Sequence, residues 1–283
     1  MAGVLYLVPT PIGNLGDISR RMAETLAEAD FIAAEDTRVT VKLLNHLELK
    51  KPMVTYHRHN TETAGPAILT RLLAGESCAL VTDAGTPAIS DPGEDLVALC
   101  AEAGVTVCAV PGPCALVTAL SVSGLPTARF TFEGFLPMNR KNRRAQLGSL
   151  RLETRTMIFY EAPHKLLSTL EDLAEAFGPD RRLSVCRELT KLHEDIWKTT
   201  LGEAVEHYKA NEPRGEYVLV MAGAPETADP EQALTLEQAA QRALELTGQG
   251  FGPTAAAKAA AQGTPYSKSE VYKKLLMLQQ AGK

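Results

Sequence analysis

The stretch VLYLVPTPIGNL, residues 4–15, opens on a short apolar run and passes directly into a loop rich in proline and glycine. Further apolar, β-branched runs follow at residues 31–34, 53–56, 78–82 and 106–110. Amphipathic segments separate them, at residues 19–29, 39–47, 62–74 and 91–103. Repeated strand–helix units build a parallel sheet with helices on both faces, so this pattern predicts an N-terminal α/β domain over residues 1–113.

After Gly112 the rhythm changes, and the strands of a second sheet are predicted at residues 130–135, 156–160, 183–187, 195–200 and 217–221. Residues 192–195 are too short for a crossover helix, so the two strands that flank them are expected to pair antiparallel. These features predict a second α/β domain with a mixed sheet over residues 114–224. The stretch 224–230 is predicted to be a linker, and residues 225–283 a small helical tail with helices at 236–246, 254–261 and 267–279.

Composition and charge limit the kind of protein. The chain has 283 residues, of which 45% are hydrophobic, so it can bury a core. It contains no apolar run of the ~20 residues that span a bilayer, and its start lacks a basic region, which predicts a cytoplasmic protein without a membrane partner. Its 5 cysteines are odd in number and none forms a CxxC pair, which favours reduced thiols over disulfides or zinc.

Loops rich in proline, glycine and acids follow the predicted strands, at residues 9–15, 35–38, 83–87 and 111–115. In parallel sheets, ligands bind at the carboxyl ends of the strands, where glycine lets backbone amides approach closely. The pattern predicts a small-molecule pocket. No GxxxxGK[ST] or GxGxxG occurs in these loops, which disfavours ATP, NAD, FAD and the methyltransferases with a glycine-rich first loop.

Motifs along most of the chain carry a resemblance to a known family. They are LYLVPTPIGNL (5–15), AEDTR (34–38), TDAGTPAISDPG (82–93), VPGPCA (110–115), EGFLP (133–137), YEAPH (160–164), RELTK (187–191) and RGEYV (214–218). In this order they resemble the tetrapyrrole methylase superfamily. Within it, they resemble the branch that 2′-O-methylates a cytidine ribose in 16S ribosomal RNA of the small subunit.

The resemblance implies a methyl donor, S-adenosyl-L-methionine, bound in a cleft between two α/β domains. It also implies a homodimer and an acceptor that is 16S ribosomal RNA or the small ribosomal subunit. The implied donor contacts are Val8, Pro9, Asp83, Ala84, Gly85, Ile89, Pro111, Ala115, Tyr160, Leu189 and Gly215. Asp83 is the charged member, and its carboxylate suits the ribose or ammonium group of the donor, although an aspartate before a glycine is also a common turn residue.

A ribose hydroxyl is a poor nucleophile, so a side chain that takes its proton would assist the transfer. The candidates are His57, Asp36 and Glu133, with Glu35, His59 and Glu161 as competitors. Histidine suits neutral pH. Asp36 beside Arg38 is better suited to a structural ion pair or to orienting the substrate ribose. The histidines show no HExxH spacing, and no metal is expected.

The net charge of -5 disfavours a protein that simply coats duplex nucleic acid. Residues 138–155 are nevertheless strongly basic, and Arg140, Lys141, Arg143 and Arg144 are predicted to contact RNA phosphates, together with Arg38. The alternative for such a run is a solvated helix face. The last two predicted helices resemble a helix-turn-helix, or form a plain helical cap.

Two rival functions stay open. One is a methylase of the same superfamily that acts on a tetrapyrrole, and the other is an RNA-binding module without catalysis. The basic segment and the low aromatic content of 5% favour RNA over a porphyrin-like substrate. The intact loops at 83–87 and 111–115 favour an enzyme.

Overall fold

The computed structural model describes residues 2–225, 234–262, 264 and 266–281, and these fall into two compact units. The N-terminal unit comprises the residues up to Thr118 together with Glu188–Glu194. The second unit comprises Ala119–Arg187 and the described residues from Asp195 onward. Each unit contains one five-stranded sheet, which confirms the predicted class of two α/β domains.

The N-terminal unit is built on a parallel sheet with the strand order β3-β2-β4-β1-β5. Its strands are β1 (Val4–Leu7), β2 (Phe31–Ala34), β3 (Met53–Thr55), β4 (Cys78–Val81) and β5 (Thr106–Ala109). The residues of β2 and β4 are all buried, as expected for central strands covered on both faces. Because all five strands run in the same direction, the loops that follow them lie along one edge of the sheet.

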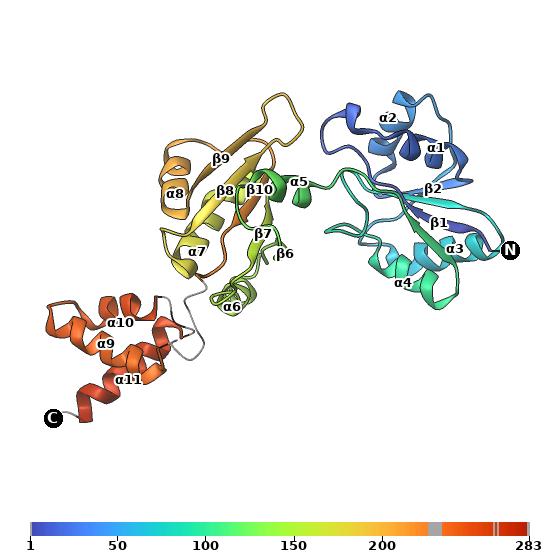
Figure 1. Ribbon diagram of the computed structural model, residues 1–283. Helices are drawn as coiled ribbons and strands as arrows, with labels where there is room; N and C mark the ends of the chain where they lie inside the picture. The colour runs from blue at the N-terminus through green and yellow to red at the C-terminus, as the bar shows by residue number, and fades with distance from the viewer. Residues whose placement is uncertain (1, 226–233, 263, 265, 282–283) are drawn as a thin grey trace. The chain divides into compact units, whose positions relative to one another are not determined.

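Helices cover both faces of this sheet (Figure 1). Side chains of α1 (Arg20–Glu28) and α2 (Thr37–His46) pack on one face around Met22, Leu26 and Leu44. Those of α3 (Thr61–Leu73) and α4 (Glu94–Glu102) pack on the other around Leu72, Leu96 and Tyr56. A short 3-10 helix, η1 (Leu15–Asp17), follows the first loop.

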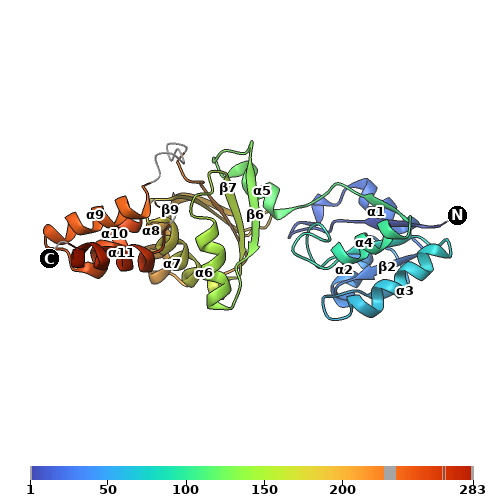
Figure 2. The same ribbon diagram turned by 90° about the horizontal axis from the view of Figure 1, so that it is seen from below.

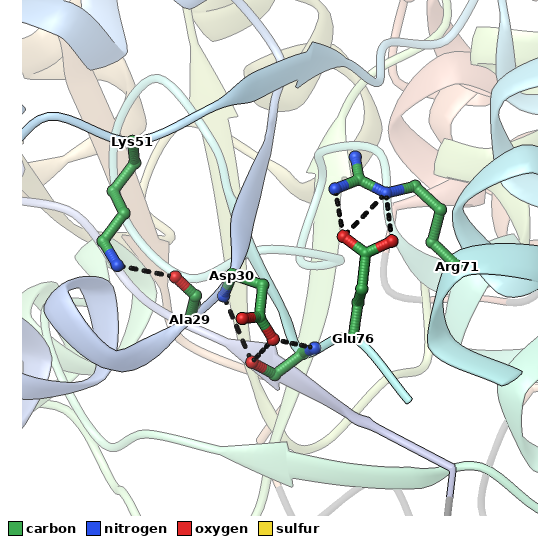
Figure 3. Close-up of polar contacts among 6 residues, drawn as sticks. Ala29, Asp30, Lys51, Arg71 and Glu76 are labelled. Atoms are coloured by element: carbon green, nitrogen blue, oxygen red, sulfur yellow. Dashed lines mark hydrogen bonds and ion pairs between the residues drawn. The ribbon is translucent and has the colours of Figure 1, made fainter. Parts of the chain in front are cut away.

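The amino-terminal edge of the sheet is closed by structural polar contacts (Figure 3). The Asp30 carboxylate accepts hydrogen bonds from the Ser77 backbone N–H and hydroxyl, both at 2.7 Å. Lys51 donates to the Ala29 carbonyl at 2.8 Å. Arg71 pairs with Glu76 while its guanidinium lies over the Phe31 ring. Each of these charged side chains has a partner within this unit, so the edge is a structural closure.

The second unit has a mixed sheet with the order β6-β7-β10-β8-β9. Its strands are β6 (Phe130–Phe135), β7 (Thr156–Glu161), β8 (Arg182–Arg187), β9 (Asp195–Thr200) and β10 (Tyr217–Met221). Only the β6–β7 pair is parallel among these strands, and β8 and β9 pair antiparallel as predicted. The helices are α5 (Ala115–Val122), which crosses the division between the units, α6 (Arg140–Ser149), η2 (Pro163–Lys165), α7 (Leu166–Phe177) and α8 (Leu201–Ala210).

The chain ends in three helices that lie side by side in both views (Figures 1 and 2). They are α9 (Leu236–Gly248), α10 (Pro253–Ala261) and α11 (Lys268–Ala281), close to the predicted ranges. Their core is mostly alanine, sealed by Val271 and Leu275, so the helices approach closely. Most of the predicted linker at 224–230 lies outside the described residues. Within the described residues, no helix combines the length and apolarity that a membrane crossing needs.

Candidate functional site

The loops that follow β1, β4 and β5 are joined to one another by hydrogen bonds. Thr10 and Gly85 exchange backbone N–H···O bonds of 2.9 Å in both directions, and the Thr10 hydroxyl donates to the Thr82 carbonyl at 3.0 Å. Thr86 donates to the Pro113 carbonyl at 2.9 Å. Because each loop is tied to its neighbour, the backbone at this edge is preorganised before any ligand binds.

Gly112 allows the loop after β5 to approach the loop after β1. A Cβ at this position would lie 3.0 Å from Pro9 Cβ and 3.2 Å from Met22 Sδ. Both distances are tighter than ordinary carbon–carbon and carbon–sulfur packing, so a side chain here would push the two loops apart. A side chain in place of the glycine of the VPGPCA motif would thus require Pro9 or Met22 of α1 to shift by a few tenths of an ångström.

Four carboxylates gather at the ends of β2 and β4. The buried Thr82 hydroxyl donates to Glu35 Oε2 at 2.7 Å, and the Asp91 side chain also hydrogen-bonds Thr82. The Asp83 carboxylate accepts the backbone N–H of Asp36. These contacts join the loops after β2 and β4 and orient the carboxylate of Asp83.

The shared negative charge shifts the pKa values of this cluster. Partial loss of hydration around the carboxylate, followed by the charges of Glu35 and Asp36, raises the pKa of Asp83. Burial and the Glu35 carboxylate raise the pKa of Asp91 to about 6. Asp36 behaves in the opposite way, because hydrogen bonds from the Arg38 side chain and backbone lower its pKa to about 2. The cluster therefore favours a cationic ligand at this edge.

Most of the predicted donor contacts lie together in these loops of the N-terminal unit. Val8, Pro9 and Gly85 are buried within the loops, whereas Asp83 and Ala84 are exposed beside them. The other members in this unit are Ile89, Pro111, Ala115 and Leu189. Tyr160 at the end of β7 and Gly215 before β10 belong to the second unit.

The candidate bases sit in different local settings. His57 follows β3, and its Nδ1 accepts the His59 backbone N–H at 3.3 Å, so the neutral ring carries its proton on Nε2. Asp36 forms a two-pronged ion pair with Arg38, with Nη2–Oδ2 at 2.6 Å and Nε–Oδ1 at 3.0 Å. Glu133 lies on β6 of the second unit and accepts a hydrogen bond from Gln146 at 3.2 Å. Glu161 is buried and bonded to Thr169.

Sequence reasoning missed two features of this edge. Thr82 and Asp91 lie in the TDAGTPAISDPG motif, but only the tertiary contacts show that they form a chain with Glu35. The segment Glu188–Glu194 reaches the N-terminal unit, where a Cβ on Gly13 would lie 2.4 Å from Lys191 Cγ. Glu188 and Thr190 in this segment have positive φ angles of 51° and 67°, an uncommon backbone conformation that could not be predicted from the sequence.

Comparison with known proteins identifies the family. The model of the tetrapyrrole (corrin/porphyrin) methylases matches residues 4–205. The chain belongs to this family. A Synechocystis protein named ribosomal RNA small subunit methyltransferase I is 46% identical over 280 residues, which cover 99% of this chain and 100% of the relative.

A Thermotoga maritima protein of the same name is 47% identical over 221 residues, which cover 78% of this chain and 99% of the relative. Among solved structures, the uroporphyrin-III C-methyl transferase of Thermus thermophilus, complexed with S-adenosyl homocysteine, aligns with a TM-score of 0.56. It is 18% identical and covers 78% of this chain and 97% of its own. At that identity the likeness is one of fold.

The basic segment of this methylase forms α6, and its cations differ in their contacts. Arg143 contacts α7, where its Nε lies 2.5 Å from Asp172 Oδ2 and its Nη2 lies 2.8 Å from Thr169 Oγ1. Its side chain is only 11% exposed. Arg140, Lys141 and Arg144 are exposed. The predicted RNA-contacting set thus contains one residue that ties two helices together.

Replacing Arg143 with methionine is expected to lower the free energy of unfolding of the second unit by about 1–3 kcal/mol. The change removes a charge-assisted hydrogen bond from a largely buried position. Urea denaturation followed by the fluorescence of Trp197, the single tryptophan of the chain, would measure the loss. Arg144→Met is the matched control, since Arg144 is exposed on the same helix. Equal stability of the two variants would contradict the structural role of Arg143.

Asp91→Asn is expected to stabilise the protein more at pH 7.5 than at pH 4.5. The pKa of Asp91 is raised from 3.8 to about 6, so the folded state binds this proton more tightly than the unfolded state. The free energy of unfolding of the wild type therefore falls as pH rises from about 4 to 6, and the loss persists above. Because solvent screens charges at this half-buried site, we expect Asp91→Asn to raise the free energy of unfolding at pH 7.5 by about 1–2 kcal/mol. The urea midpoints of the wild type and of Asp91→Asn, measured at both pH values, check this prediction. If the two proteins differ equally at pH 4.5 and pH 7.5, the raised pKa of Asp91 is wrong.

Proposed function

We propose that this chain transfers a methyl group from S-adenosylmethionine to the 2′-hydroxyl of a cytidine ribose in 16S ribosomal RNA. The observation that carries the proposal is the 46% identity, over 99% of the chain, to a relative named for methylation of small-subunit ribosomal RNA. The choice of ribose and of cytidine rests on the sequence motifs that resemble that branch of the family.

The donor loops fit a cationic ligand. S-adenosylmethionine supplies an electrophilic methyl group on a positively charged sulfonium and also carries an ammonium group. Asp83 is exposed, it lies beside Glu35 and Asp36, and its carboxylate has capacity for further hydrogen bonds. We assign it to the ribose or ammonium group of the donor. The remaining contacts are assigned to Val8, Pro9, Ala84, Gly85, Ile89, Pro111, Ala115, Tyr160, Leu189 and Gly215.

The chain's own contribution to chemistry is to position the acceptor hydroxyl and to receive its proton. Positioning of the two reactants alone can lower the activation free energy of such a transfer by several kcal/mol. With a pKa of about 2, Asp36 stays ionised at neutral pH and suits orienting Arg38 or the substrate ribose better than proton transfer. His57 and Glu133 are the proposed proton acceptors. His57 would act at Nδ1 after the contact with the His59 backbone opens.

Methyl transfer from radiolabelled S-adenosylmethionine tests the function directly. The acceptors are small ribosomal subunits and naked 16S RNA from a strain that lacks the gene, followed by nuclease digestion and mapping. Label on one cytidine ribose is the expected result. Calorimetric donor binding without label on either RNA would favour a tetrapyrrole acceptor, and absence of donor binding would favour an RNA-binding module without catalysis.

We also propose that the protein is a cytoplasmic homodimer. Large apolar side chains are exposed on the second unit, including Phe135 at 54% and Met138 at 82%, and a partner copy would cover them. Sedimentation equilibrium at micromolar concentration is expected to give twice the chain mass of 30.4 kDa.

A further inference from the structure

A cavity of about 780 Å³ lies in the second unit, between β9, the end of α8 and the start of β10. In Figure 1, α8 lies beside β9, and the strands β8, β9 and β10 lie next to one another. The volume is in the range of pockets that hold small organic ligands. None of the residues assigned above to the donor or to proton transfer lines it.

The register of the sheet fixes the face on which this pocket lies. Tyr217 pairs with Arg187, and Arg187 pairs with Asp195. Directly paired residues share a face and successive residues alternate, so these three side chains and that of Trp197 point to the same side. Tyr160 pairs with Val218, one residue beyond Tyr217, and therefore points to the opposite side. The pocket therefore lies on the face of the sheet opposite to the proposed donor contact Tyr160.

An aromatic wall lines the pocket. Trp197 and His207 have ring centroids 4.8 Å apart, His207 and Tyr208 are 4.9 Å apart, and Tyr208 and Tyr217 are 5.9 Å apart. Tyr217 is buried, Trp197 and Tyr208 are partly exposed, and His207 is exposed. The rings thus run from the core to the surface, where a flat ligand can stack on them.

Hydrogen-bond donors and hydrogen-bond acceptors surround this aromatic wall. Arg187 Nε is buried and has no hydrogen-bond partner within the described part of the chain. Buried donors in native structures are normally paired, so this N–H is available to a ligand acceptor. The exposed carboxylate of Asp195 offers an acceptor, and Arg214, which pairs with Glu212 at 3.0 Å, offers further donors at the rim.

This combination fits a nucleobase better than a phosphate. A base presents a flat face for stacking and an edge with both donors and acceptors. The lining carries the carboxylates of Asp195 and Glu212 beside two arginines, so its charges balance and do not select a free anion. Proteins recognise unpaired RNA by stacking exposed bases on aromatic and arginine side chains. We propose that this pocket binds one unpaired nucleobase of the ribosomal RNA, stacked on Trp197. This inference rests on the proposed function, in which ribosomal RNA is the acceptor.

The single tryptophan makes the pocket directly observable. The full-length protein is titrated with a single-stranded cytidine hexaribonucleotide and with 16S RNA, and tryptophan emission is followed. A base stacked on the indole is expected to quench the emission in a saturable way. An abasic ribose-phosphate hexamer is the control and is expected to leave the emission unchanged. No quenching by either RNA, or equal quenching by the abasic hexamer, overturns the proposal.

Matched variants give a second readout. Trp197→Leu keeps apolar volume but removes the aromatic face, and Trp197→Phe keeps a ring. The leucine variant is expected to raise KM for the RNA at least about five-fold with kcat unchanged, whereas the phenylalanine variant stays within about two-fold. Equal effects of the two substitutions, or a fall in kcat alone, would overturn the stacking role. Melting curves identify any loss that comes from unfolding.

The outcomes separate this proposal from the proposed function. If RNA quenches the tryptophan emission but accepts no methyl group, the pocket binds a base and the proposal that ribosomal RNA is the methyl acceptor is wrong. Methyl transfer to 16S RNA without quenching, and with an unchanged KM for Trp197→Leu, would refute the pocket alone.

Discussion

Asp83→Ala is expected to weaken the binding of S-adenosylmethionine about 10- to 100-fold. The change removes a carboxylate that the Asp36 backbone N–H orients at the end of β4. A hydrogen bond to a charged group contributes about 1.5–3 kcal/mol, which corresponds to this range in Kd. Isothermal titration calorimetry with S-adenosylmethionine, and with S-adenosylhomocysteine as the uncharged-sulfur analogue, measures the change.

The same titration separates the charge of Asp83 from its shape. Asp83→Asn keeps the side-chain volume, so its loss of affinity reports the charge. The loss is expected to be similar for the two ligands, because both carry the ribose and the ammonium group to which Asp83 is assigned. Glu102→Ala, at the exposed end of α4, is the control and is expected to bind as the wild type does. Unchanged affinity of Asp83→Ala would remove this residue from the donor site.

Reversing the three exposed cations of α6, in the variant Arg140→Glu/Lys141→Glu/Arg144→Glu, is expected to raise KM for the RNA about 100-fold at physiological salt. Each cation that contacts a phosphate releases counterions, so the dependence of binding on salt is expected to become shallower as well. Donor affinity is expected to stay unchanged. Methyl transfer to small subunits between about 50 and 200 mM salt measures both effects.

Arg143 is left intact in that variant because it pairs with Asp172 and its loss would confound RNA binding with stability. The control reverses three exposed cations outside α6, in the variant Lys42→Glu/Lys50→Glu/Arg129→Glu. The same change of net charge on other surfaces is expected to have a much smaller effect. Equal losses in the two triple variants would show that overall charge, and not α6, attracts the RNA.

The two sheets could be predicted because their strands are short, apolar and separated by clear helical periods. The runs at 31–34 and 78–82 contain β2 and β4, whose residues are buried on both faces. The antiparallel pairing of β8 and β9 followed from the length of the connection alone. The cations of 140–144 illustrate the limit, because sequence spacing did not distinguish the buried Arg143 from the exposed Arg144.

The fold class, the family and the loops at the strand ends could be predicted from the sequence alone, because these depend on local periodicity and on contiguous motifs. Which side chains meet across those loops depends on how the separate elements pack together. The Glu35–Thr82–Asp91 chain, the contact of Lys191 with Gly13 and the aromatic pocket around Trp197 join residues far apart in the chain. Their pKa values, hydrogen bonds and burial depend on distances of a few ångströms between separate elements, and such distances exist only after the sheets have formed.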